Sequence, residues 1–169
     1  MRNLFLLALA LGLMACQPQQ PNNQLPQELP LTPSPRIPAA EKVRGQVLYV
    51  PVYSSILHED GKVHHLSVQL SVRNISLKAE IVVAYVDYYD TNGKLVRHYV
   101  ESPFKLNPLE TRDFFVKRND LAGGTGANFV LEWEAKEPAA PPLVEAVMIS
   151  TTSGLGISFL TQGKEIEHH

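Results

Sequence analysis

The sequence predicts an all-β fold in which two antiparallel sheets pack face to face as a sandwich. Apolar residues alternate with polar ones along several segments, and turn-forming residues separate these segments at intervals of about 8 to 15 residues. No segment carries the apolar stripe of an amphipathic helix. A closed barrel would give the same pattern and is the alternative architecture.

The clearest strand is residues 66–73, where every even position is apolar and every odd position is polar. Residues 81–89 are apolar on both faces, as expected for a strand inside a sheet. Asp90, Asn92 and Gly93 then supply the chemistry of a tight hairpin turn into a strand over residues 95–100. These segments predict a β-hairpin in the middle of the chain.

The remaining strands are expected at residues 46–53, 112–118, 128–136, 143–152 and 157–161. Together they make about seven or eight strands, for which immunoglobulin-like topology is the commonest arrangement. Pro51 places the first strand at a sheet edge or at a bulge, because proline donates no ladder hydrogen bond.

Length and charge limit the classes of function. The chain has 169 residues, 44% of them hydrophobic, which suits one folded domain with an ordinary core. Its formal net charge of −2 gives no basic surface for phosphates, so we expect no nucleic-acid partner.

The N-terminus has the pattern of an export signal. Met1-Arg2-Asn3 is followed by an uninterrupted apolar run at residues 4–15, too short for a bilayer span of roughly 20 residues. The segment 13–16, Leu-Met-Ala-Cys, is similar to the bacterial lipobox, apart from the large Met14. We therefore expect a signal peptide at residues 1–15 and a diacylated Cys16, which would hold the protein on a membrane. Gln17 after the cysteine implies, by the same resemblance, the periplasmic side of an outer membrane if the cell has one.

A tether is expected between this anchor and the domain. Residues 17–40 contain seven prolines, five glutamines and no glycine, a composition typical of extended polyproline II chain. At about 3.1 Å per residue the segment could reach roughly 70 Å from the lipid. We therefore divide the chain into a signal peptide (1–15), a lipidated tether (16–43), a sandwich domain (44–166) and a tail (167–169).

The first candidate site is a glycine-rich turn before the strand that contains the only tryptophan. Its residues are Gly123, Gly124, Thr125, Gly126, Ala127 and Asn128. No phosphate-binding fingerprint is present, because no Gly-Lys-Ser/Thr follows and Phe129 stands where the dinucleotide motif needs glycine. The glycines predict either a tight loop or a backbone-lined recognition loop. In the strand that follows, we expect Phe129, Leu131 and Trp133 to face the core.

The second candidate is the hydroxyl-rich segment 150–156, with Ser153, Gly154 and Gly156 as its recognition residues. Neither candidate supplies a nucleophile with a base, and the sole cysteine is assigned to the lipid. We therefore expect no enzymatic activity, no catalytic residue and no cofactor.

A hydrolase or metal-dependent enzyme is the alternative. It would use Glu132 and Glu134, which share the outer face of one strand, although charged residues there usually face solvent. The other possible ligands are the histidines His58, His64, His65, His98, His168 and His169. Adjacent His64 and His65 must point to opposite faces of a strand, and the last two lie in a charged tail expected in solvent. We therefore predict no metal site.

Several blocks in order resemble the bacterial exported family catalogued as domain of unknown function 3124. They are Gly45-Gln46-Val47-Leu48-Tyr49-Val50-Pro51-Val52-Tyr53, Leu70-Ser71-Val72-Arg73-Asn74, Tyr88-Tyr89-Asp90-Thr91-Asn92-Gly93-Lys94-Leu95-Val96, residues 123–133, and residues 145–149 with 156–159. The resemblance spans about residues 44 to 166. It implies an exported envelope protein and brings no activity, cofactor or catalytic residue with it.

The functional expectation is a lipid-anchored β-sandwich of the cell envelope. It would bind a protein, a glycan or a small ligand through loops at one end, because loops on a rigid scaffold usually carry binding. A structural role in envelope assembly, marked by self-association, is a further alternative.

Overall fold

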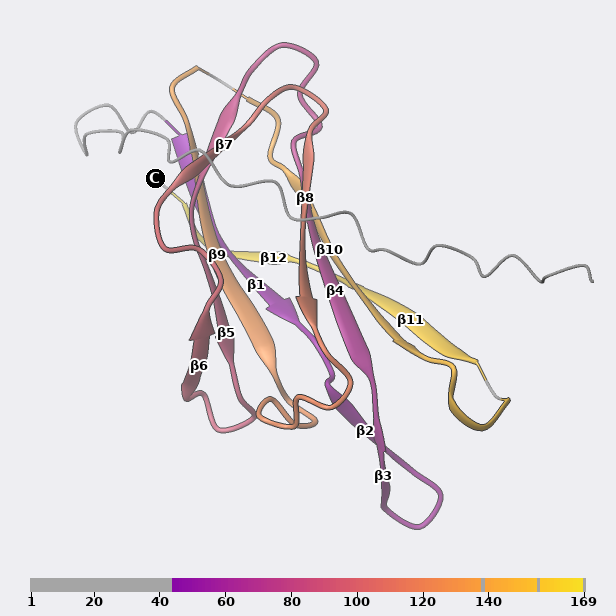
Figure 1. The fold of residues 1–169 in the computed structure, drawn as a ribbon. Helices are drawn as coiled ribbons and strands as arrows, with labels where there is room; N and C mark the ends of the chain where they lie inside the picture. The colour runs from indigo at the N-terminus through magenta and orange to yellow at the C-terminus, as the bar shows by residue number, and fades with distance from the viewer. Residues whose placement is uncertain (1–43, 138, 155, 169) are drawn as a thin grey trace, which may run out of the picture. The chain divides into compact units, whose positions relative to one another are not determined.

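The computed structural model describes residues 44–168 except 138 and 155. The predicted signal peptide, Cys16 and the tether lie outside the described residues. Within them the chain forms twelve strands, one short 3₁₀ turn and no α-helix, so no helix that could cross a membrane occurs there (Figure 1). The strands are β1 (Arg44–Pro51), β2 (Ser55–His58), β3 (Lys62–His65), β4 (Ser67–Arg73), β5 (Ile81–Tyr89), β6 (Leu95–His98), β7 (Phe104–Leu106), β8 (Thr111–Val116), β9 (Asn128–Ala135), β10 (Leu143–Ser150), β11 (Ile157–Gln162) and β12 (Lys164–His168), and the 3₁₀ turn η2 is Thr152–Gly154.

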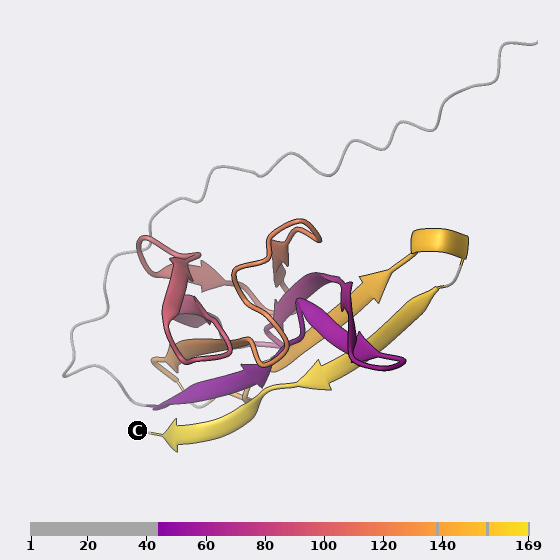
Figure 2. The ribbon, with the colours of Figure 1, turned by 90° about the horizontal axis from the view of Figure 1, so that it is seen from below.

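Two antiparallel sheets form the sandwich that the alternating pattern predicted (Figures 1 and 2). One six-stranded sheet has the order β12-β1-β9-β5-β6, with β7 also paired to β5. The second sheet has the order β11-β10-β4-β8, and β2 and β3 form a separate hairpin. The sheets do not close into one ring of paired strands, so the sandwich prediction is confirmed over the barrel.

The topology preserves the central pairs of the immunoglobulin fold. In that fold strand B pairs with E in one sheet and C pairs with F in the other. Here β4 pairs with β8, and β5 pairs with β9. The flanking strands are exchanged: β1 lies beside β9, where the last immunoglobulin strand stands, and β10 lies beside β4, where the first one stands. The sequence correctly predicted the class, but the structure has more than the expected seven or eight strands.

The core lies between the sheets and is centred on β9. Phe129, Leu131 and Trp133 are buried on its inner face, as the alternation predicted. The Trp133 indole Nε1 donates a 3.0 Å hydrogen bond to Oε1 of Gln46, the residue directly opposite on β1. The N–H of a buried tryptophan usually has a hydrogen-bond partner, and here Gln46 supplies it.

The C-terminal segment corrects one prediction. Residues 164–169 were expected to form a charged tail with its histidines in solvent, but β12 pairs with β1, placing Glu167 opposite Val47 and His168 opposite Gln46. The side chain of His168 is still exposed. Between β11 and β12 the chain passes from one sheet to the other at Gly163, whose N–H donates to the Val144 carbonyl oxygen at 2.9 Å. This crossing joins the two sheets along one side of the sandwich.

Three further features differ from the prediction. The β2–β3 hairpin and the short strand β7 were not expected. β1 is not an edge strand, since it lies between β12 and β9. Its ladder with β12 covers only residues from Gln46 to Tyr49, so within the described strands Pro51 lies beyond that ladder and pairs only with Asn128 of β9. The register shift of the β12 ladder lies between Val47 and Leu48 and not at Pro51.

Candidate functional site at the loop end

The two candidate loops lie at the same end of the sandwich. The glycine loop precedes β9, and the 150–156 loop joins β10 to β11. In both views the β2–β3 hairpin lies between them (Figures 1 and 2). The two loops predicted as candidate sites therefore flank a hairpin that the sequence did not predict.

Thr91, in the β5–β6 turn, fastens one side of the glycine loop. Its Oγ1 donates to the Gly123 carbonyl oxygen and accepts from the Gly126 N–H, each at 2.9 Å. The Thr91 N–H also donates to the Gly123 carbonyl oxygen at 2.9 Å. The turn itself has the predicted form, with Gly93 at φ 76° and Asp90 Oδ1 accepting from the N–H groups of Asn92 and Lys94.

Ser54, between β1 and β2, fastens the other side. The Gly124 N–H donates to Ser54 Oγ at 2.8 Å, and this hydroxyl donates to the Gly124 carbonyl oxygen at 3.1 Å. The Ser55 N–H donates to the same carbonyl oxygen at 3.2 Å, and the Val52 N–H donates to Ala127 O at 2.9 Å. Five backbone groups of the loop are thus bonded within the protein, namely the carbonyl oxygens of Gly123, Gly124 and Ala127 and the N–H groups of Gly124 and Gly126. Thr125 and Asn128 are the polar side chains that the loop offers to a ligand.

Steric contacts explain why two positions of this loop are occupied by glycine. A Cβ on Gly123 would lie 1.8 Å from the Tyr88 hydroxyl oxygen and 2.9 Å from the Ala127 Cβ. Gly124 has φ 84°, in the left-handed region that favours glycine, and a Cβ there would lie 2.6 Å from Thr91 Oγ1. The loop is therefore closely packed on the strands beneath it.

The Tyr88 hydroxyl under this loop is buried, and within the described part of the chain it makes no hydrogen bond of ordinary geometry. Burial raises the pKa of Tyr88, and the nearby Ser54 hydroxyl opposes that shift. An unpaired buried hydroxyl costs stability, so this position is a weak point of the core.

The 150–156 loop has a different construction. Ser150 Oγ and Thr152 Oγ1 lie 3.1 Å apart at the start of η2, and Gly154 has φ 75°. Added Cβ atoms at Gly154 or Gly156 would meet no atom within 4 Å, so this loop is open where the glycine loop is packed. The side chain of Ser153 lies outside the described residues.

A family model with the description "Protein of unknown function (DUF3124)" matches residues 45–166. The chain belongs to this family. The predicted resemblance is confirmed, and the match covers all strands except the last two residues of β12 and the first residue of β1. A search of curated proteins finds no match. Among solved structures, a crystal structure titled Thermotoga maritima 1070 is similar with 9% identity, covering 70% of this chain and 92% of that one, at a TM-score of 0.43.

The DUF3124 domain also has a serine–histidine contact that the sequence pattern did not predict. Ser55 and His65 are cross-strand partners in the β2–β3 hairpin, and Ser55 Oγ lies 2.9 Å from His65 Nδ1. Ser55 is buried, and no acidic side chain bonds to His65 among residues 44–168 as described. The pair therefore has the geometry of a structural hydrogen bond that ties the two hairpin strands together. Only the strand register, which brings residues 55 and 65 together, could have revealed it.

The other histidines of the domain are dispersed. As predicted, adjacent His64 and His65 point to opposite faces, since His64 packs edge-on against His58 with ring centroids 5.7 Å apart. His98 Nδ1 lies 2.8 Å from Asp87 Oδ1 on the six-stranded sheet. Within the described part of the chain no group of three or more His, Cys, Asp or Glu side chains could hold a metal ion.

Glu132 and Glu134 share the outer face of β9, as expected from the alternation. Glu134, however, is buried rather than solvated, and it lies in the ladder between Gly45 of β1 and Val82 of β5. Glu132 is half-buried opposite Val47 and Tyr85, and its charge, after burial itself, contributes to the raised pKa of Tyr85. The two carboxylates lie in the six-stranded sheet and not beside the histidines of the hairpin.

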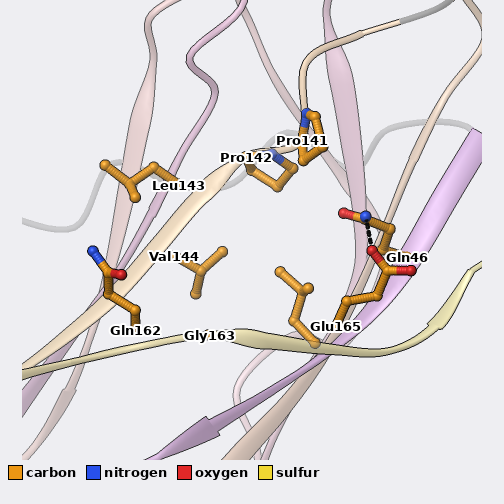
Figure 3. A pocket seen from close by; sticks show the side chains of 9 residues that line it. Gln46, Pro141, Pro142, Leu143, Val144, Gln162, Gly163 and Glu165 are labelled. Atoms are coloured by element: carbon orange, nitrogen blue, oxygen red, sulfur yellow. Dashed lines mark hydrogen bonds between the residues drawn. The ribbon is translucent and has the colours of Figure 1, made fainter.

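A pocket of about 220 Å³ lies near the start of β1 and β10, remote from the loop end (Figure 3). Its lining residues are Gln46, Leu48, Pro141, Pro142, Leu143, Val144, Gln162, Gly163 and Glu165. The polar groups in its wall are already paired: Gln46 Nε2 donates to Glu165, and Gln162 Nε2 donates to Glu145 Oε1 at 3.2 Å. The pocket wall is therefore polar and apolar in about equal measure, with its amide side chains already engaged within the protein.

Proposed function

We propose that this DUF3124 protein is a lipid-anchored interaction module of the cell envelope, which binds a partner protein through the loop end of its sandwich. The observation that carries the proposal is the β2–β3 hairpin, where Leu57 and Val63 lie directly opposite each other and are 61% and 54% exposed. Such an exposed cross-strand apolar pair at a projecting position is typical of an interaction site.

The hairpin is held to the sandwich by several contacts near its base. The Leu66 N–H donates to Ser54 O at 2.9 Å, and Ser55 bonds to both Gly124 and His65. Arg118 Nε also donates to the His65 carbonyl oxygen at 3.3 Å. A hairpin fixed at its base can present side chains without losing much conformational entropy on binding.

Exposed apolar side chains continue beside the hairpin. Tyr53 lies two residues before β2 in the chain, and Leu121 lies in the segment that leads to the glycine loop. An apolar, projecting surface favours a protein partner over a glycan or a small polar ligand, because burial of Leu and Val contributes about 1.5 to 3 kcal/mol per side chain. The glycine loop serves mainly to support the hairpin, with Thr125 and Asn128 at the edge of the surface.

The test uses a photo-crosslinking amino acid at position 57 in the intact cell envelope, with the same amino acid at Leu77 as the control. Leu77 is 77% exposed and lies in the loop between β4 and β5, at the other end of the sandwich. The expected result is a discrete protein adduct from position 57 only. With that partner purified, Leu57→Ser with Val63→Ser should weaken binding at least about tenfold, while Leu77→Ser should not. Equal adducts from both positions, or unchanged affinity, would refute the proposal.

The glycine loop and the anchor have their own tests. Replacing Gly124 and Asn128 should lower the melting temperature and leave the partner bound if the loop only supports the hairpin, whereas a folded variant that loses the partner would make it a recognition loop. For the anchor, Cys16→Ser should abolish incorporation of labelled palmitate and move the protein from the detergent phase to the aqueous phase. Retention of the label would disprove lipidation at Cys16.

A further inference from the structure

The free edge of β11 differs from the other edges of the two large sheets in carrying no charged side chain. Its six residues, ISFLTQ, include no charged side chain, no proline and no glycine. The opposite edge strand, β8, carries Arg112 and Asp113, and β12 carries Lys164, Glu165 and Glu167. On the remaining edge, β6 carries Arg97 and His98, and β7 carries Lys105. Proteins usually protect edge strands with such charges, and among the edges of the two large sheets β11 alone lacks this protection.

The β11 edge is also regular. Its ladder with β10 runs from Glu145–Gln162 to Ser150–Ile157 without a register shift. The β12 and β6 ladders both contain a shift. Within residues 44–168 as described, no strand pairs with the other side of β11, which borders its sheet (Figure 1). A straight strand with unpaired N–H and C=O groups is a template for a further antiparallel strand.

An apolar band on the outer face of this sheet reaches the edge. Leu160 of β11 is 50% exposed and lies opposite Val147 of β10. Ile149, one step along the same face of β10, is also exposed. Phe159, on the inner side, packs edge-on against Tyr53 with ring centroids 5.7 Å apart, which holds the strand against the domain. A strand added at this edge would therefore meet a fixed backbone and an apolar outer surface.

We propose that two copies of the protein pair through β11 in an antiparallel arrangement, which joins their two four-stranded sheets into one continuous sheet. An uncharged strand has no like charges to oppose when it meets itself, whereas β12 would bring Lys164, Glu165 and Glu167 of one copy beside those of the other. Residues paired across an antiparallel ladder point to the same side, so the two outer faces become continuous only if a residue pairs with one of the same parity. The two-fold axis must then pass through a residue, and the two registers that pair most of Ile157–Gln162 place it at Leu160, or at Phe159 with Leu160 opposite Ser158. Because each copy has one such edge, pairing closes as a dimer and does not propagate.

The first experiment measures the mass of the lipid-anchored protein in detergent by sedimentation velocity between about 1 and 100 µM protein. The protein should dimerise with rising concentration, and Leu160→Lys should raise the dissociation constant at least about tenfold, because it puts like charges on either side of the axis. Phe115→Lys is the matched control, since Phe115 is 49% exposed on the same face but lies on β8, at the opposite edge. Both substituted side chains point outward, and circular dichroism with a melting curve checks that each variant is folded.

The second experiment fixes the register. Under mild oxidation, Leu160→Cys should form a disulfide between copies if the axis passes through Leu160, since paired Cα atoms about 4.5 to 5.5 Å apart permit that bond. If the axis passes through Phe159, a mixture of Leu160→Cys and Ser158→Cys chains should form it instead. Phe115→Cys should remain unlinked.

A monomer at 100 µM would overturn the proposal, and would indicate that the edge is covered by another segment of the same chain or serves a different protein. A dimer that Phe115→Lys disrupts and Leu160→Lys does not would overturn it equally.

Discussion

Gly123→Ala tests whether the glycine loop is held by its packing on Tyr88. The new Cβ would lie 1.8 Å from the Tyr88 hydroxyl oxygen, 2.7 Å from its Cζ and 2.9 Å from the Ala127 Cβ. Ordinary contacts between such atoms begin at about 3.4 Å, so the overlap with the hydroxyl exceeds an ångström and cannot be absorbed by a small shift. Tyr88 is fully buried, and its ring packs against Phe129 at a centroid distance of 4.9 Å, so it has no free space into which to move.

Overpacking of this kind costs typically about 1 to 3 kcal/mol, and the severity of this contact places Gly123→Ala near the upper end. For a domain of this size a loss of 1 kcal/mol lowers the melting temperature by about 3 to 6 °C, so we expect a decrease of roughly 10 °C. The measurement is thermal and urea unfolding followed by circular dichroism. Gly156→Ala is the matched control, because its Cβ would meet no atom within 4 Å, and its stability should change by less than about 0.5 kcal/mol.

A double-mutant cycle identifies the clashing atom. Tyr88→Phe removes the hydroxyl, which has no ordinary hydrogen bond within the described structure, and should be neutral or slightly stabilising. In that background Gly123→Ala should cost about 1 kcal/mol less than in the native protein, with part of the loss remaining because of the Cζ and Ala127 contacts. An unchanged melting temperature for Gly123→Ala, or additive effects of the two substitutions, would refute this account of the loop.

Three further predictions concern stability. Asn74→Ala should cost about 2 to 4 kcal/mol in urea unfolding, because the buried Asn74 amide donates to the carbonyl oxygens of Ala79, Leu106 and Asn107, while the exposed Asn119→Ala should cost almost nothing. Thr91→Val should lower the free energy of unfolding by about 1 to 3 kcal/mol, because it removes the hydrogen bonds to Gly123 and Gly126. Thr91→Ser keeps the hydroxyl and should retain most of that stability, so equal losses for the two variants would contradict this role. Burial raises the pKa of Tyr88 above 10.0, so the folded protein binds this proton more tightly than the unfolded chain. Its contribution to stability is therefore complete below pH 10 and is lost as the pH rises through the folded pKa. When the pH is raised above 10, urea unfolding should show that Tyr88→Phe loses less stability than the native protein does.

The central strands were predictable because each carries its own periodic signal. Residues 66–73 alternate strictly, and all but the first form β4; residues 81–89 form β5 with the bounds expected from their apolar run. The missed elements lack such a signal. The β2–β3 hairpin has only four residues per strand and exposes apolar residues on a face where alternation would place polar ones. β12 is composed mainly of charged residues and is a strand only because β1 offers it a free edge after the chain turns at Gly163.

The candidate site shows the same limit at the level of single residues. The sequence identified the glycines of the 123–128 loop, because glycine is distinctive wherever it clusters. It could not identify Ser54, Tyr88 and Thr91, which are ordinary residues 32 to 70 positions away and acquire their role only through the register of β1, β5 and β9. Once those partners are known, the need for Gly123 follows from the Tyr88 hydroxyl, and five backbone groups of the loop are found to be bonded internally. The loop can therefore act on a partner mainly through the hairpin that it holds, which is why the proposed contact surface centres on Leu57 and Val63 and not on the glycines themselves.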